Sequence, residues 1–305
     1  MVKHITLHAV PPFDFDLSAS TYAGGDPQIS GYADGKYWQP LRINGKLALA
    51  TLRSSGTVDS PTVHAQLAST TPLSSADAKR AREILAMVFS LGLDLEPFYR
   101  MAGEDPVLSK IAKHLRGLKP RSTPTVFEAL VDSIIEQQIS LSASQSMELK
   151  LIRAFGDTLE VDGQTYYAFP TPDRISSATI PQLQRCGLSA RKAEYIKSIA
   201  RQVAHGALDL EKFKSYDDMN AIIAELDEVR GIGVWTAELT MIRGMGKLDA
   251  IPADDLGLKR CIAYYYREGK VITGAEARQI AARWEPFRGL AAFYLIVAYG
   301  LDVEP

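Results

Sequence analysis

The chain has 305 residues, of which 46% are hydrophobic, and a formal net charge of −2. This length can hold two or three packed units, and no apolar run is long enough to span a membrane. The first residues do not resemble a signal peptide, so we expect a cytoplasmic protein. The two cysteines, Cys186 and Cys261, are far apart in the sequence, which excludes a cysteine-rich metal or iron–sulfur site and disfavours a structural disulfide. We therefore predict no metal site of this kind and no organic cofactor.

The first 95 residues predict a small sheet followed by one helix. Strand patterns occur at residues 5–10, 37–43, 46–52 and 62–67. Asn44-Gly45 is a strong signal for a two-residue hairpin between the second and third strands. Ser74 and Asp77 then show the pattern of a capping box, and an apolar stripe continues the helix to about residue 91. Strands followed by a helix favour an antiparallel sheet backed by that helix, so we predict an N-terminal α/β domain of residues 1–95.

From residue 96 onward, helical patterns replace strand patterns, which makes the predicted fold class α+β. The predicted helices cover residues 106–115, 125–137, a stretch that stops at Gly156, 177–185, a stretch from Ser189, 222–229, a stretch from 234, 258–266, 273–284 and 290–299. A loop or short hairpin is expected around Asp162-Gly163. We predict a second domain of residues 96–305, with an inserted helical subdomain at about 125–215 and a hairpin of two helices at about 222–243.

That helical hairpin is the most informative stretch of the chain. An apolar helix stops at Arg230-Gly231-Ile232-Gly233, and a second helix follows at once. Two glycines around one isoleucine predict a turn too tight for ordinary side chains, with the isoleucine packed back between the helices. The unpaired N–H groups of Gly233 and its successors carry partial positive charge and favour an anion such as a phosphate. The alternative is a plain corner between two helices whose glycines serve geometry only.

Two motifs in this region resemble a known family. The segments 229–237 (VRGIGVWTA) and 252–255 (PADD) are similar to the helix-hairpin-helix and the catalytic aspartate of base-excision DNA glycosylases. The similarity is greatest to the 3-methyladenine DNA glycosylase II (AlkA) type, over roughly residues 96–300 and more loosely over the first 95. The resemblance implies a monomeric enzyme that flips an alkylated base out of double-stranded DNA and excises it.

The resemblance implies a set of DNA-binding residues around the hairpin. These are Arg230, Gly231, Ile232, Gly233 and Thr236 in the hairpin, Gln137, Gln138, Ile139 and Ser140 at the end of the long helix, and Lys192. Gln138 maps onto the family's wedge, which fills the space that the flipped base leaves, although wedges are usually apolar. The alternative is a polar helix end with no contact to DNA. The resemblance also implies that a structural monovalent cation can rest on the backbone carbonyls of the hairpin.

Asp255 matches the catalytic position of the family. A leaving base makes the sugar an oxocarbenium-like cation, which a neighbouring carboxylate stabilises while it orients or deprotonates water. We expect Asp254 rather than Asp255 to cap the following helix. The alternative is that both acids are helix caps or solvated side chains.

The substrate pocket is expected to be aromatic and apolar. Trp235 stands where glycosylase/lyases of this superfamily have a lysine that forms a Schiff base, so we predict a monofunctional enzyme that uses water. A cationic alkylated base stacks well on an electron-rich ring. The candidate pocket residues are Trp235, Trp284 and Phe287, with Phe13 and Phe15 from the first domain, and Leu239 and Leu256, which stand where some AlkA-type proteins have tyrosines.

The net charge of −2 argues against DNA binding, because DNA-binding proteins often have a basic excess. Two basic stretches, 110–121 and 185–201, soften this objection, and their alternative interpretation is solvated helix faces. Two other functions stay open. One is a non-catalytic DNA-binding module that uses the same hairpin. The other is an oxidised-purine glycosylase/lyase, which would need the lysine that Trp235 replaces.

Overall fold

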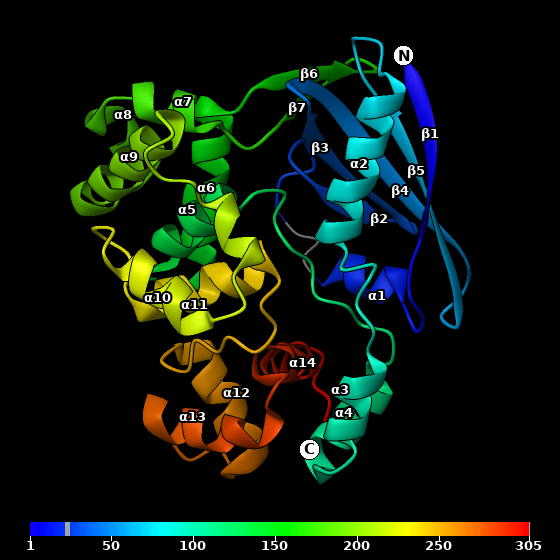
Figure 1. Ribbon diagram of the computed structural model, residues 1–305, viewed down its shortest axis with the longest axis vertical. Coiled ribbons are helices and arrows are strands. Elements are labelled where there is room, and N and C mark those ends of the chain that lie inside the picture. The colour runs from blue at the N-terminus through cyan, green and yellow to red at the C-terminus, as the bar shows by residue number, and fades with distance from the viewer. Residues whose placement is uncertain (22–24, 305) are drawn as a thin grey trace.

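The computed structural model describes residues 1–21 and 25–304, which form a five-stranded sheet and a larger body of helices. The strands are β1 (Val2–His8), β2 (Gly31–Ala33), β3 (Lys36–Ile43), β4 (Lys46–Thr57) and β5 (Ser60–Ala68). They pair antiparallel in the order β1-β5-β4-β3-β2. Helix α2 (Ser75–Val88) lies across one face of this sheet (Figure 1). The predicted α+β class is therefore confirmed.

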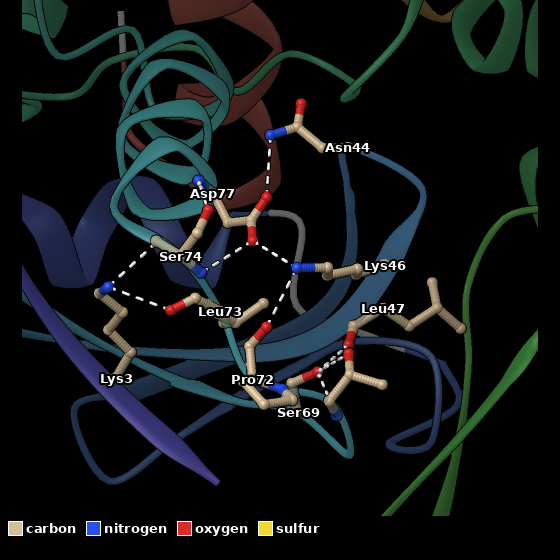
Figure 2. Close-up of polar contacts among 10 residues, drawn as sticks. Lys3, Asn44, Lys46, Leu47, Ser69, Pro72, Leu73, Ser74 and Asp77 are labelled. Carbon is tan, nitrogen blue, oxygen red and sulfur yellow. Dashed lines mark hydrogen bonds and ion pairs between the residues drawn. The ribbon is translucent and has the colours of Figure 1, made fainter.

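Local signals determine how α2 and the sheet meet. Asn44 and Gly45 both have positive φ values, 49° and 80°, as a two-residue hairpin turn requires. Figure 2 shows that the Asp77 carboxylate accepts hydrogen bonds from Asn44 Nδ2 at 3.0 Å and from Lys46 Nζ at 2.7 Å. Ser74 Oγ accepts from the Asp77 N–H at 3.1 Å, which completes the predicted capping box. These bonds, that from Lys46 above all, lower the pKa of Asp77, so the helix start is tied to the hairpin by a charged side chain.

The helical body contains one further short hairpin, β6 (Thr158–Val161) with β7 (Gln164–Tyr167), around Asp162-Gly163. Its helices, with α1 from the N-terminal part, are α1 (Phe15–Ser20), α3 (Glu96–Ala102), α4 (Pro106–His114), α5 (Val126–Glu136), α6 (Leu141–Phe155), α7 (Pro172–Ser177), α8 (Ile180–Gln184), α9 (Ala190–Ala204), η1 (Glu211–Ser215), α10 (Met219–Asp227), α11 (Val234–Thr240), η2 (Met241–Met245), α12 (Leu256–Tyr266), α13 (Gly274–Ala281), η3 (Ala282–Trp284) and α14 (Arg288–Gly300). The predicted N-cap Ser189 accepts from Lys192 N, which confirms that helix start.

Some of the predicted elements differ in the structure. The single helix expected at 177–185 is two helices, α7 and α8, because Ala178 and Thr179 are extended and Thr179 opens a new capping box with Gln182. The helix after Gly233 is α-helical only to Thr240 and then continues as the π-helical turn η2. Such turns often lie at functional sites.

Buried side chains form three clusters. The N-terminal core joins the sheet to α2, from Ile5 to Leu91. The middle core runs from Val126 to Ala250 and includes both helices of the hairpin. The C-terminal core combines residues 95–118 with residues 251–298, so α3 and α4 pack beside α14 although they precede the middle core in the chain (Figure 1). The catalytic candidate Asp255 therefore lies just after the chain passes from the middle core to the C-terminal one.

Among the described residues, no helix has the length and apolarity to cross a membrane.

Candidate functional site

The hairpin between α10 and α11 requires glycine at one position, Gly231. Its φ is +100°, and a Cβ added there would lie 2.4 Å from the ring of Tyr195 on α9. Neither the left-handed backbone nor the contact admits a larger residue. Ile232 is 4% exposed and packs into the middle core, as predicted. Arg230 is exposed, and its guanidinium carbon lies 5.6 Å from the centre of the Tyr195 ring.

Gly233 has a different environment, and the expectation that both glycines are needed for the turn is wrong. Its backbone is extended, with φ −111° and ψ 178°, and nothing lies within 4 Å of an added Cβ. Gly233 is the N-cap of α11 and offers no side chain to the N–H groups that begin the helix. The residue therefore leaves open space in front of unpaired backbone donors, at an exposed end of the hairpin.

Gln137 ties the end of α5 to the hairpin. Its Nε2 donates to Gly231 O and to Thr236 Oγ1, both at 2.9 Å. Thr236, which we predict to bind DNA, is buried, so its side chain is not available for such a contact. The Gln137 and Thr236 side chains hold the hairpin together from inside.

Lys192 also acts within the protein. Its ammonium donates to Ile135 O at 2.8 Å and to Gln137 O at 2.7 Å, the carbonyls at the end of α5. The side chain is half-buried, and burial lowers its pKa. The prediction that Lys192 binds DNA is therefore corrected: its ammonium is used within the protein, to cap a helix whose last carbonyls lack N–H donors of their own.

The turn between α5 and α6 exposes Gln138. This residue has φ +58° although it is not a glycine. Ile139 beside it is half-buried, and Ser140 caps α6 by accepting from Ala143 N at 3.3 Å. Gln138 is therefore presented to solvent between two capped helices, beside the hairpin that Gln137 contacts.

Asp255 is the N-cap of α12, and the assignment of that role to Asp254 is wrong. Asp255 Oδ1 accepts from Leu258 N at 2.8 Å. Within residues 25–304 and 1–21, Oδ2 has no hydrogen-bond partner. Asp255 is half-buried, whereas Asp254 is exposed and places its carboxylate 2.0 Å from where a Cβ of Gly274 would lie. Because a cap bond holds one oxygen, the Asp255 carboxylate has a fixed direction and one oxygen to offer.

The loop before Asp255 is connected to α11, the second helix of the hairpin. Glu238 on α11 is buried and accepts from Arg278 Nη1 at 2.7 Å and Nη2 at 3.2 Å. The same Nη1 donates to Ile251 O at 3.3 Å. A charge-assisted pair with two bonds fixes orientation better than a single bond. The hairpin helix and the aspartate loop are thus connected through α13.

Some of the predicted pocket residues are partly exposed in the structure, and others are fully buried. Trp235 and Leu239, one turn apart on α11, are both half-buried. Trp284 is 0% exposed in the C-terminal core, where its Nε1 donates to Asp105 Oδ2 at 3.3 Å, so it cannot contact a base and that prediction is wrong. Phe13 and Phe15, each 2% exposed in the N-terminal core, are excluded for the same reason. Phe287 is half-buried against Phe98, with ring centres 6.0 Å apart, and Leu256 is 76% exposed beside Asp255.

Acidic residues of α5 and α6 form a cluster that we did not predict from the sequence. Glu128, Asp132 and Glu136 follow one another at four-residue spacing on α5, which usually indicates a solvated helix face. Here they are half-buried with Glu148 of α6, and Glu136 pairs with Arg243 of η2 at 2.6 Å. Burial first, and neighbouring carboxylates second, raise the pKa of Glu128, Asp132 and Glu148. Across the described chain no group of three or more such side chains could hold a metal ion.

Two cavities lie away from Asp255. One, of about 830 Å³, is lined by α6 and the end of α8, with Lys150 and Arg185 among its lining residues. The other, of about 520 Å³, separates the five-stranded sheet from the β6–β7 hairpin, beside Trp38 and Tyr166. Neither contains a residue of the hairpin or of the aspartate loop.

Comparison with known proteins identifies the class. The model of the HhH-GPD superfamily of base excision DNA repair proteins matches residues 131–286, just over half of the chain. The chain belongs to this superfamily. It is 37% identical to the DNA-3-methyladenine glycosylase of Bacillus subtilis over 209 residues, which is 68% of each protein.

Solved structures agree with this assignment. The 3-methyladenine DNA glycosylase of Archaeoglobus fulgidus superposes with a TM-score of 0.84 at 27% identity, over 99% of both chains. The 3-methyladenine DNA glycosylase of Schizosaccharomyces pombe, solved with abasic DNA, superposes with a TM-score of 0.57 at 26% identity. That match covers 67% of this chain and 96% of the other.

Proposed function

We propose that the chain is a monofunctional DNA glycosylase that flips an alkylated base, such as 3-methyladenine, out of double-stranded DNA and hydrolyses its bond to the sugar. The observation that carries the proposal is the half-buried Asp255 carboxylate, which Leu258 N holds at Oδ1 and which has no hydrogen bond to Oδ2 among the described residues. Its loop is linked to the hairpin helix through Arg278 and Glu238. The names of the similar proteins from Bacillus subtilis and Archaeoglobus fulgidus support the substrate class.

The hairpin binds the DNA backbone, so its binding does not depend on the base sequence. The N–H groups at the start of α11 lie beside open space at Gly233, where a phosphate can approach the backbone closely. Arg230 is exposed at the same turn and adds a positive charge. Gln138, exposed at the α5–α6 turn, fills the space left by the flipped base and can hydrogen-bond to the opposite base.

Asp255 assists the bond cleavage. As the bond between base and sugar breaks, its electron pair leaves with the base and the sugar becomes positive. The negative Oδ2 faces that charge and stabilises it, and it accepts a proton from the attacking water. The water oxygen bonds to the sugar carbon, so the products are a free base and an abasic site.

Trp235 gives the reaction its monofunctional character. A tryptophan cannot form a Schiff base, so water is the nucleophile and the strand is not cut. Its half-buried ring, with Leu239 one turn on, forms a wall on which a cationic alkylated base stacks favourably. An oxidised-purine glycosylase/lyase would need an amine at this position.

A cation at the hairpin is compatible with the carbonyls there. Those of Val229 and Gly233 each accept one hydrogen bond, from Ile232 N and Ala237 N. A carbonyl oxygen has two lone pairs, so each keeps one for a ligand. A monovalent cation bound there would add positive charge beside the phosphate. We further propose that the enzyme acts on DNA as a monomer.

The test is release of base from damaged DNA. Wild-type protein is incubated with methylated, deaminated and oxidised duplexes, and released bases are separated by chromatography. We expect release from methylated DNA, and no protein–DNA adduct when borohydride is added. If DNA is bound but no base is released, the chain is a binding module. If borohydride traps an adduct, the reaction is that of a lyase.

A further inference from the structure

Gln138 has a backbone conformation that needs support from its surroundings. A φ of +58° is uncommon and unfavourable at a residue with a side chain. The residue is exposed, so no packing of its own side chain holds this conformation. Contacts of the residues that precede Gln138 must therefore hold it.

Two side chains do so. The Lys192 ammonium donates to Ile135 O and Gln137 O, at 2.8 and 2.7 Å, and so holds the last carbonyls before Gln138. The Gln137 side chain donates to Gly231 O and Thr236 Oγ1 and so holds the same turn against the hairpin. One contact comes from α9 and the other reaches α11. The turn is thus fixed to two helices of the middle core.

We propose that Lys192 and Gln137 are positioning residues that hold Gln138 at a fixed place relative to the phosphate-binding hairpin, so that its side chain enters the duplex when the hairpin grips the strand. The inference rests on the proposed function. Neither residue touches the base or the sugar. Their effect is on the step that takes the base out of the stack.

This role predicts a dependence on base pairing. Extrusion costs more free energy for a paired base than for one that is mismatched. A displaced Gln138 side chain no longer helps to extrude the base. This loss slows excision mainly where the cost of extrusion is high. Loss of the Lys192 or Gln137 hydrogen bonds should therefore slow excision of a paired lesion much more than excision of the same lesion in a mismatch. General damage to the protein would slow both equally.

The experiment measures single-turnover excision of one methylated base in two duplexes, paired and mismatched. Lys192→Met removes both hydrogen bonds and keeps the apolar stem. Lys192→Arg keeps donors at the same place. Lys197→Met is the matched control, because Lys197 lies on the same helix and its ammonium donates to Ala178 O, at the end of α7. Gln137→Met removes the hydrogen bonds from Gln137 to the hairpin, and it tests the inference independently if Lys192→Met unfolds.

We expect Lys192→Met and Gln137→Met to slow the paired lesion about tenfold more than the mismatched one. Lys192→Arg should restore most of that ratio, and Lys197→Met should leave both rates as in wild type. Equal slowing on both duplexes, or no slowing, would overturn the inference. A wild-type protein that releases base from neither duplex would instead overturn the proposed function.

Discussion

At the scale of single residues, the two glycines of the hairpin meet different physical requirements. Gly231 is needed by the fold, because of its φ of +100° and the ring of Tyr195 against it. Gly233 has ordinary extended backbone and open space around it. A side chain at Gly233 therefore interferes with a ligand rather than with the protein.

Gly233→Ser separates folding from binding. Serine is a preferred N-cap, so the free energy of unfolding should stay equal or rise by up to about 1 kcal/mol. The new side chain fills the open space and uses helix donors, so affinity for duplex DNA should fall about tenfold. Urea unfolding and fluorescence anisotropy measure the two quantities. Gly231→Ala is the contrast and should lower stability by about 2 kcal/mol or more. Unchanged affinity in Gly233→Ser would remove the hairpin from the DNA interface.

At the scale of elements, helices α5 and α6 carry acids into a half-buried contact. Glu136 has Arg243 as a partner at 2.6 Å. Asp132 Oδ1 is buried and, in the described part of the chain, has no hydrogen-bond partner. Burial raises the pKa of Glu148 from its ordinary value of 4.5 to about 7. Between these two values the unfolded chain releases a proton that the folded chain keeps, so rising pH favours unfolding.

Glu148→Gln should remove this penalty. Above pH 7 the wild type holds a buried charge, so the variant should be more stable by about 1–3 kcal/mol at pH 8. At pH 4 both states of the wild type are largely protonated, and the two proteins should unfold at nearly the same denaturant concentration. Urea unfolding at the two pH values measures the difference. A variant that is less stable than wild type at pH 8 would mean that the charged carboxylate is stabilised by Arg243.

At the scale of the whole molecule, the parts of the site that are local in sequence could be predicted, and those that depend on distant contacts could not. The Asn44-Gly45 turn, the capping box at Ser74 and the plug of Ile232 each depend on a few neighbouring residues, and each is present. The turn and the capping box are complete within one turn of chain, and the burial of Ile232 follows from its apolar side chain in a tight turn between two helices.

Other roles are set by partners far along the chain. Trp284 is a core residue because Asp105 and the C-terminal helices surround it. The Lys192 ammonium donates to carbonyls at the end of α5, one of them on Gln137, 55 residues earlier in the chain. Aromatic and basic residues have the same sequence appearance in a core, a pocket or an interface, so only the packing decides among them.

The cap of α12 shows the same limit at closer range. Both Asp254 and Asp255 are suitable N-cap types, and sequence alone does not say which one begins the helix. The structure gives the cap to Asp255, the residue to which we also assign catalysis. The two roles are compatible because the cap uses Oδ1 and leaves Oδ2 for the reacting sugar.

The Asp255→Asn variant tests the central claim most directly. Asparagine caps a helix as well as aspartate does, so α12 should form and the unfolding transition should match wild type. The variant lacks the negative charge that stabilises the sugar cation. We therefore expect single-turnover release of base from methylated duplex to fall by about a hundredfold or more, with affinity for the duplex unchanged. Release at the wild-type rate by a folded, DNA-binding Asp255→Asn protein would contradict the account.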